Sequence, residues 1–217
     1  MNQEYYRRLQ WIASLCIAVF IVHFALCMLV MNRSVYKHTK ADYAQTGTVA
    51  ISKAEAELYY EQVADSFSSF FKGDYEIAGY SLTETNKKQL NTLKGYYRLA
   101  WIVSIVSFGC GAYCIGKLWR RRETMPLLYG SAGGALLTSI FALRIVLSDK
   151  PVLGGIRNMI FRGDYSFFSE GDLLRDILPA AFARNLAFYY LGIVTIEILC
   201  FVLLRMVIRF SGRPHKY

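Results

Sequence analysis

Four long stretches of predominantly apolar residues alternate with polar segments along the chain. The apolar stretches cover about residues 11–31, 97–118, 126–147 and 186–210. Each can cross a bilayer as an α-helix, because roughly 20 predominantly apolar residues span the hydrocarbon core. The pattern predicts an all-α membrane protein with four transmembrane helices, in which residues 1–217 form a single membrane domain.

The short link between the second and third stretches contains Arg120, Arg121 and Arg122. Lys and Arg accumulate in the short cytoplasmic loops of membrane proteins, so this link is predicted to lie inside the cell. Both termini are then cytoplasmic, and segments 32–96 and 148–184 lie outside. We expect these two outer segments to form a helical extracytoplasmic cap on a multi-pass protein of the cell membrane.

The formal net charge of +9 would fit a nucleic-acid-binding protein if it covered one soluble surface. Each outer segment, however, carries as many acidic as basic residues, and the surplus lies at the amino terminus, the arginine link and the tail from Arg205. Basic groups beside a membrane favour the anionic inner leaflet. The charge therefore indicates topology and membrane lipids as partners, and no nucleic acid is expected.

All five cysteines fall inside the apolar stretches, so a disulfide framework is not expected in the outer segments. Cys110 and Cys114 are one helical turn apart and could in principle bind a metal. No further Cys or His lies near them in the sequence. We interpret them as small packing residues, and we predict neither a metal nor a cofactor.

The first outer segment contains a helix signal. Ser52 and Glu55 have the spacing of a capping box, in which each side chain satisfies a backbone N–H at a helix start. Apolar residues at helical spacing follow, which predicts an amphipathic helix ending near Gly73. They are Ala54, Leu58, Tyr59, Val63, Phe67, Phe70 and Phe71. Its aromatic face would lie on the outer leaflet or against the membrane bundle, and the sequence leaves both open. Thr83 is expected to cap a second helix that continues into the second span.

Several residues within the predicted spans stand out. Gly130 and Gly134 form the G-x-x-x-G spacing that permits close approach between membrane helices. His23 is either functional or a neutral side chain bonded to a neighbouring helix. Glu197 is either paired with Arg144 or protonated and bonded to a Ser or Thr of a neighbouring helix.

Arg144 lies near the outer end of the third span. It either extends to the interface or presents a cation to a phosphate or carboxylate there. In the second outer segment, the aromatic-rich stretch 161–168 is long and irregular for a plain connector, and such loops are functional or disordered. Its aromatic content argues against disorder.

The order of parts resembles the bacterial lipoprotein intramolecular transacylase family of integral membrane proteins. Residues 52–71 resemble the family's first outer helix, and residues 82–94 are similar to its signature Thr-Glu-x-Glu-x-x-His-Met-x-Asp-Val-Lys. Residues 159–182 resemble its second outer loop. With the topology, the resemblance covers nearly the whole chain.

The chain departs from this family at positions that would carry protons. Gln89 stands at the family's histidine, Thr92 at its aspartate, and Arg157 and Asn158 where a histidine is expected in the second loop. The resemblance implies transfer of an acyl chain from the glycerol of a diacylglyceryl cysteine to the cysteine's own amino group. Histidine suits this reaction because its pKa lies near the working pH. Gln89 can donate a hydrogen bond to an oxyanion but cannot carry a proton.

Two hypotheses follow. The first is a divergent relative that acts on or binds acylated lipoprotein, such as a diacylated amino terminus, or lipid at the outer leaflet. Its candidate catalytic residues are Glu84 and Gln89, with Glu84 or His38 as the base. The substrate-binding candidates are Lys94, Arg144, Arg157, Asn158, Phe161 and Asp164. The second is a non-catalytic accessory protein that keeps the cap for binding a lipid or partner. Convergence of Glu84 or His38 with Gln89 and Arg157 on a cavity would favour the enzyme.

Overall fold

The computed structural model describes residues 3–32, 36, 52–68, 84–119, 121–146 and 180–210. These residues form five helices and no strand, so the predicted all-α class is confirmed for the described part of the chain. The helices are α1 (Gln3–Met31), α3 (Lys53–Ser68), α4 (Glu84–Trp119), α5 (Met125–Val146) and α8 (Ala180–Phe210).

α1, α4 and α8 contain the predicted apolar stretches and extend beyond them, and α5 covers 126–146 of the predicted 126–147. α4 runs without a break from Glu84 to Trp119, so the prediction that the helix after Thr83 continues into the second apolar stretch is confirmed. α1 begins at Gln3 and α8 at Ala180, both before the predicted span starts at residues 11 and 186. By length and composition, α1, α4 and α8 are the three helices of the described residues identified as able to cross a membrane.

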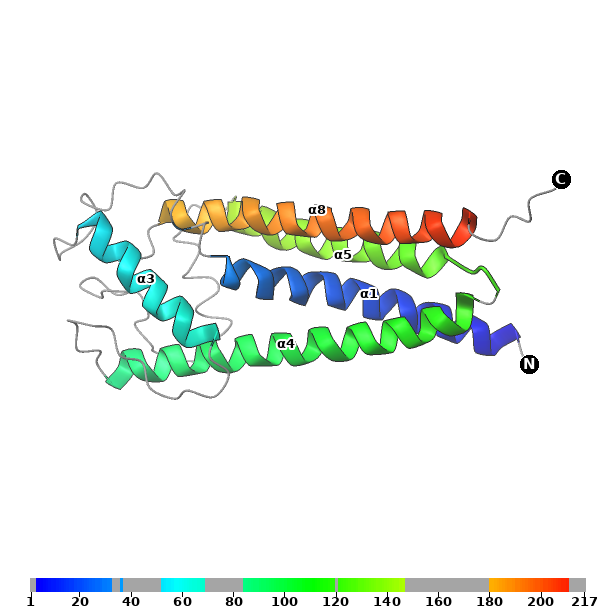
Figure 1. Cartoon of the computed structure of the whole chain (residues 1–217), viewed down its shortest axis with the longest axis horizontal. Helices are drawn as coiled ribbons and strands as arrows, with labels where there is room; N and C mark the ends of the chain where they lie inside the picture. Colours follow the sequence, from blue (N-terminus) through cyan, green and yellow to red (C-terminus); the bar gives the residue numbers. More distant parts are fainter. Residues whose placement is uncertain are drawn as a thin grey trace. The chain divides into compact units, whose positions relative to one another are not determined.

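The chain divides into two compact units. The first comprises Met1–Met28, Leu99–Phe141 and Tyr190–Tyr217, and the second comprises Leu29–Arg98 and Ala142–Tyr189. Within the first unit, the start of α1, the end of α4, the start of α5 and the end of α8 lie at one end, which we call the link end (Figure 1).

The link end is held by contacts between α1 and the turn after α4. Gln10 donates a hydrogen bond to the Glu123 carboxylate, and the Arg121 guanidinium lies 3.6 Å from the centre of the Tyr6 ring. α4 ends in a Schellman pattern: the N–H of Glu123 donates to the Leu118 carbonyl, and the N–H of Arg122 donates to that of Trp119. The pattern places Arg122 at φ 58°, in the left-handed region.

The G-x-x-x-G spacing of α5 faces α1. A Cβ added to Gly130 would lie 2.6 Å from the Ile17 Cβ, and one added to Gly134 would lie 3.1 Å from the Ile21 Cβ. Only a residue without a side chain allows the two backbones to approach this closely. The predicted role of the two glycines in helix packing is confirmed.

Two further helices pack on α1. Leu9 and Ala13 of α1 form a buried cluster with Cys114 of α4, so the packing role predicted for this cysteine is confirmed. On another side, the Tyr190 hydroxyl of α8 donates a hydrogen bond of 3.0 Å to the Val22 carbonyl of α1. α1 therefore contacts all three of the other long helices in the first unit.

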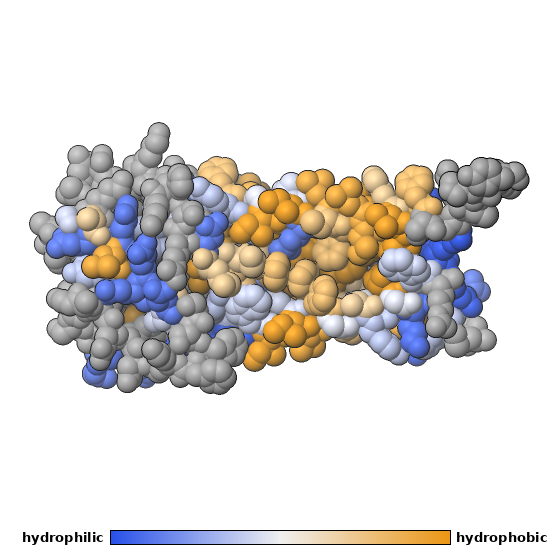
Figure 2. Space-filling view, in the orientation of Figure 1, coloured by the Kyte–Doolittle hydropathy of each residue, from blue (hydrophilic) through white to orange (hydrophobic). Residues whose placement is uncertain are grey.

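The outward faces of these helices are apolar. Leu15, Ile105, Leu136 and Ile196, one from each long helix, are each at least 63% exposed. Apolar side chains cover the surface of this helical region in Figure 2. Such a surface is suited to lipid rather than water.

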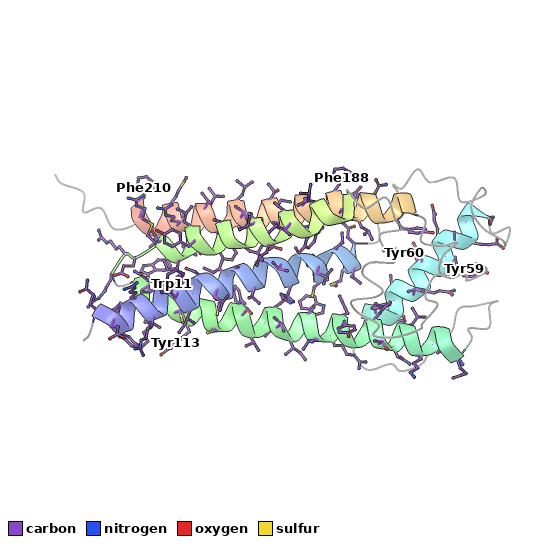
Figure 3. The ribbon with its side chains drawn as sticks, turned by 180° about the vertical axis from the view of Figure 1, so that it is seen from behind. Trp11, Tyr59, Tyr60, Tyr113, Phe188 and Phe210 are labelled. Atoms are coloured by element: carbon purple, nitrogen blue, oxygen red, sulfur yellow. The ribbon has the colours of Figure 1, made fainter. Side chains whose placement is uncertain are left out.

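Large aromatic side chains lie on the outside near the link end. Trp11, Tyr113 and Phe210 are between 61% and 70% exposed, and Figure 3 shows them there on three different helices. Amphipathic aromatic rings are enriched at membrane–water boundaries. Their position agrees with a membrane location in which the link end lies at one boundary.

The second unit contains α3, which begins with the predicted capping box. The Ser52 N–H and hydroxyl donate to the Glu55 carboxylate at 2.8 and 2.7 Å, and the Glu55 N–H donates back to the Ser52 hydroxyl at 3.3 Å. α3 ends at Ser68, before the predicted end near Gly73, and residues 69–83 lie outside the described part. Glu55 is exposed, so the box acts on the helix end and not on a buried core.

The buried face of α3 differs from the predicted one. Leu58, which was placed on the apolar face, is 49% exposed, whereas Ala56 is 1% exposed. Tyr60 stacks on the buried ring of Tyr36 with centroids 4.1 Å apart, so the packed side of α3 includes Ala56 and Tyr60, one turn apart. Phe67 also contacts Tyr97 of α4, which favours packing against protein for this end of the aromatic face.

Candidate functional site

The first part of α4 carries the candidate residues that the structure describes best. Leu90, Lys94 and Tyr97 follow at spacings of four and three residues, so they share one helix face. They are 2%, 3% and 6% exposed, respectively. The Phe67 ring of α3 meets the Tyr97 ring edge-on at 6.0 Å. Lys94 is therefore a buried cation next to Leu90 and Tyr97, and the same side of the helix also carries Lys87 and Arg98.

Burial of Lys94 is unusual within the described residues. Among the described Asp, Glu, Lys, Arg and His residues, Lys94 and Glu197 are the two whose side chains are buried. Lysine is almost never fully buried unless it has a role or a partner, because removing an ammonium from water is costly. A buried ammonium can bind an anionic or carbonyl group of a ligand without first losing many water contacts.

Other described side chains at the start of α4 are wholly or partly exposed. Glu84 forms an exposed ion pair of 3.1 Å with Lys87, and its side chain is 91% exposed. The Thr92 hydroxyl donates a hydrogen bond of 2.9 Å to the Lys88 carbonyl, so this hydroxyl has its partner within the same helix. Glu84 and Lys94 are ten residues apart, which separates them by about 15 Å along the helix axis. They therefore do not share one site.

The other candidates are placed only in part. Gln89 lies on α4 and Arg144 near the end of α5, but their side chains are outside the described part of the structure. The rest of the set, and the alternative base, lie entirely outside the described residues: Arg157, Asn158, Phe161, Asp164 and His38. The expected convergence of these groups on a cavity stays a prediction.

Two polar residues of the first unit were singled out from the sequence. The His23 imidazole Nδ1 is 2.9 Å from the Val19 carbonyl, a contact within α1 and not the expected bond to a neighbouring helix. Glu197 is 8% exposed, and neither of its carboxylate oxygens has a hydrogen-bond partner among the described residues. The Ser or Thr partner expected for a protonated Glu197 is therefore not found there.

Comparison with solved structures identifies the architecture. The membrane integral lipoprotein intramolecular transacylase Lit from Bacillus cereus matches with a TM-score of 0.85 and 17% sequence identity, over 98% of this chain and 99% of that one. A variant of that protein with a histidine replaced by arginine matches at 0.81 and 18% identity, over 97% and 94%. The chain has the fold of Lit. No sequence profile of a known family and no curated protein sequence matches it.

The match with Lit confirms, for the fold, the resemblance predicted from the order of spans and outer segments. It extends over nearly the whole chain although fewer than one residue in five is identical. Because Lit is a membrane-integral protein, the match also agrees with the apolar outer faces and the three helices long enough to span a bilayer. The protein is a membrane protein.

The sequence named Lys94 as one of six substrate-binding candidates, but its burial was not predicted. The spacing of Lys94 from Leu90 and Tyr97 was the available signal, because it places the lysine on the helix face that carries those two large side chains. The contact of Phe67 in α3 with Tyr97 on that face could not be predicted from the sequence, because the two residues lie in different helices.

Proposed function

We propose that the protein spans the membrane four times, with both termini and the arginine link inside the cell and the two outer segments outside. α5 supplies the remaining span, third along the chain: it has 22 residues, which give a length of about 33 Å, and no charged residue before Arg144. The cluster of basic residues at the link end supports this orientation. Labelling of single cysteines with a membrane-impermeant maleimide tests it. Reaction of a cysteine at Ser66 only after cell lysis would contradict it.

We propose that the outer part of the protein binds the acylated amino terminus of a lipoprotein, or a lipid, at the outer leaflet. The observation that carries the proposal is the burial of Lys94 among Leu90 and Tyr97 in a chain with the fold of Lit. In this arrangement the ammonium contacts a carbonyl or phosphate oxygen of the ligand. The apolar neighbours contact its acyl chains.

The remaining candidates complete the polar end of the proposed site. Gln89, one residue before Leu90, donates a hydrogen bond to a carbonyl oxygen. Arg144, Arg157, Asn158 and Asp164 bind the polar head of the ligand, and Phe161 packs on its acyl chain. Each of these roles is a proposal that follows from the resemblance and from the chemistry of the side chain.

A second candidate function is acyl transfer, which is favoured by the match to a transacylase over nearly the whole chain. Transfer requires a base to take a proton from the attacking ammonium, and the proton must return to the departing alkoxide. Glu84 is exposed and paired with Lys87, so its described position does not supply this base at Lys94. Binding without transfer is therefore the leading proposal.

One experiment separates the two functions. The purified protein in lipid nanodiscs is titrated with a fluorescent diacylated lipopeptide, and the free amino group of the lipopeptide is then assayed with an amine-reactive dye. Binding with the amine unchanged supports a binding protein, whereas loss of the amine demonstrates transfer. Lack of any binding contradicts both.

Lys94→Met tests the site itself. Loss of the ammonium is expected to weaken binding about tenfold or more, as for a hydrogen bond to a charged group. Lys88→Met is the matched control, because Lys88 lies on the exposed face of the same helix. Equal affinity of the two variants would exclude Lys94 from the site.

A further inference from the structure

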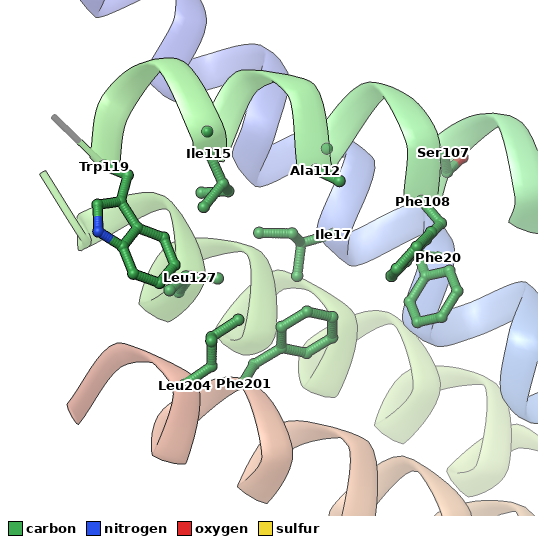
Figure 4. A pocket seen from close by; sticks show the side chains of 12 residues that line it. Ile17, Phe20, Ser107, Phe108, Ala112, Ile115, Trp119, Leu127, Phe201 and Leu204 are labelled. Carbon is green, nitrogen blue, oxygen red and sulfur yellow. The ribbon is translucent and has the colours of Figure 1, made fainter. Parts of the chain in front are cut away.

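An apolar groove lies in the first unit, close to the link end. It has a volume of about 250 Å³ and is lined by side chains from α1, α4, α5 and α8. Ile17 and Leu127 form its floor, Phe20 and Phe108 close one end, and Trp119 and Leu204 lie at the other (Figure 4). Its lining is almost entirely apolar, and Trp119 itself is 45% exposed.

Small residues of α4 keep the groove open. Ala112 and Gly116 are one turn apart, both exposed, and both line the groove. No atom lies within 4 Å of the position of a Cβ on Gly116. The groove therefore opens to the outside of the helical unit, where the surface is lipid-exposed.

The end of the groove near Leu204 has an excess of positive charge. Arg205 follows Leu204 directly; its Nε is buried without a hydrogen-bond partner, and its guanidinium reaches the Met125 sulfur at 3.9 Å. Lys117 and Arg209 are exposed on the adjoining turns of α4 and α8.

The acidic groups of this end are already engaged. Glu4 is paired with Arg8 at 2.7 Å, and Glu123 accepts the hydrogen bond from Gln10. Within the described residues, neither is in contact with Arg205. An anionic group from outside the protein would complement this guanidinium.

We propose that the groove holds one acyl chain of an anionic phospholipid from the leaflet at the link end, with the lipid phosphate at Arg205. The apolar lining matches the hydrocarbon chain, and the basic end matches the headgroup. The exposed Trp119 lines the groove at its Leu204 end, and an indole ring is suited to the headgroup region of a leaflet. This site is independent of the proposed ligand at Lys94.

Trp119 provides a direct probe of the occupant. The chain has three tryptophans, so Trp11→Phe with Trp101→Phe leaves Trp119 as the only indole. The double variant is reconstituted in vesicles that contain phosphatidylcholine and phosphatidylglycerol at equal mole fraction. In each preparation only one of the two lipids carries brominated acyl chains. Bromine quenches an indole on contact. We expect brominated phosphatidylglycerol to quench Trp119 more strongly, with an enrichment of about fivefold for one basic group.

Two pairs of variants test the groove and the charge separately. Gly116→Leu fills the groove and should remove the preferential quenching, whereas Gly109→Leu should retain it. Gly109 also has no atom within 4 Å of its Cβ position but does not line the groove. Arg205→Gln should abolish the preference for phosphatidylglycerol, and Arg209→Gln, one turn further, should leave most of it.

Equal quenching by the two brominated lipids in the parent protein would overturn the proposal. The same conclusion follows if Gly116→Leu and Arg205→Gln both retain the preference. If no brominated lipid quenches Trp119 and the protein is dimeric in the same vesicles, a second copy of the chain covers the groove, and the proposal is also wrong.

Discussion

Gly130 of α5 lies so close to Ile17 of α1 that a Cβ on Gly130 would be 2.6 Å from the Ile17 Cβ and 2.8 Å from the Ser14 carbonyl oxygen. No rotation of the Ile17 side chain relieves this contact, because it involves the Cβ and the backbone. The distance between α1 and α5 therefore depends on the absence of a side chain at one position.

Gly130→Ala is expected to lower the free energy of unfolding by about 1–3 kcal/mol, the usual cost of overpacking. Gly133→Ala is the control, since its Cβ would lie 3.5 Å from the Ala18 Cβ, an ordinary contact. The control should be neutral or slightly stabilising, because Ala favours a helix over Gly. Thermal unfolding in detergent micelles measures both, and equal stability of the two variants would contradict the packing described here.

Glu197→Leu is expected to raise the free energy of unfolding by about 1–3 kcal/mol. The substitution removes a carboxyl whose two oxygens are buried without a hydrogen-bond partner among the described residues. Thr195→Val, two residues away on an exposed part of α8, should change stability by less than about 0.5 kcal/mol. Chemical unfolding in mixed micelles compares them. Destabilisation by Glu197→Leu would indicate that the carboxyl has a partner or a bound ligand in the membrane.

Arg122→Gly should stabilise the turn after α4 by about 1 kcal/mol. The residue has φ 58°, where a Cβ is unfavourable and glycine is not. Arg122→Ala removes the same charge but keeps the Cβ, so it should give no gain. Thermal unfolding compares the two variants. If both raise the melting temperature, the effect comes from the loss of charge and not from backbone conformation.

The start of α3 should lose stability in acid. Hydrogen bonds from the Ser52 hydroxyl and N–H lower the pKa of the Glu55 carboxyl below its ordinary 4.5. A pKa lowered by folding stabilises the folded helix above the ordinary value, and this contribution disappears as the pH falls through the lowered one. Amide exchange in the first turn of α3, corrected for its intrinsic pH dependence, should therefore show weaker protection below about pH 4.

Ser52→Ala separates this contribution from general acid effects. It removes the hydroxyl from the box and should cost about 1 kcal/mol of local stability at neutral pH. The acid-dependent loss should be smaller in this variant than in the parent. The same loss in both would mean that carboxyl groups other than Glu55 are responsible.

The membrane helices could be predicted from sequence because their signals are local. The apolar stretches, the basic link and the glycines at 130 and 134 each act through composition or short spacing. The buried face of α3 could not be predicted, because the contact between Tyr60 and Tyr36 joins residues from different segments. The bond of His23 to Val19 was missed because a helix carbonyl one turn away competes with any neighbouring helix.

The candidate site was predictable only as a set of residue types. The sequence named Lys94 and not Lys88 as a binding candidate, but it did not predict that Lys94 is buried and Lys88 exposed, because burial depends on what packs against the helix. Glu84 was a reasonable base by chemistry, yet its ion pair with Lys87 is a short-range contact that the helical spacing already permitted. The groove beside Gly116 had no sequence signal, since four helices must assemble before it exists.

The central position of α1 affects how the protein is made. α1 leaves the ribosome before α4, α5 and α8, but its contacts with Cys114, Gly130 and Tyr190 involve these later segments. Until α8 has entered the bilayer, part of α1 must face lipid or a translocation factor. Its composition tolerates both: Ile17 and Ile21 are as compatible with hydrocarbon as with protein, whereas a strongly polar residue there would hinder insertion before the partners arrive.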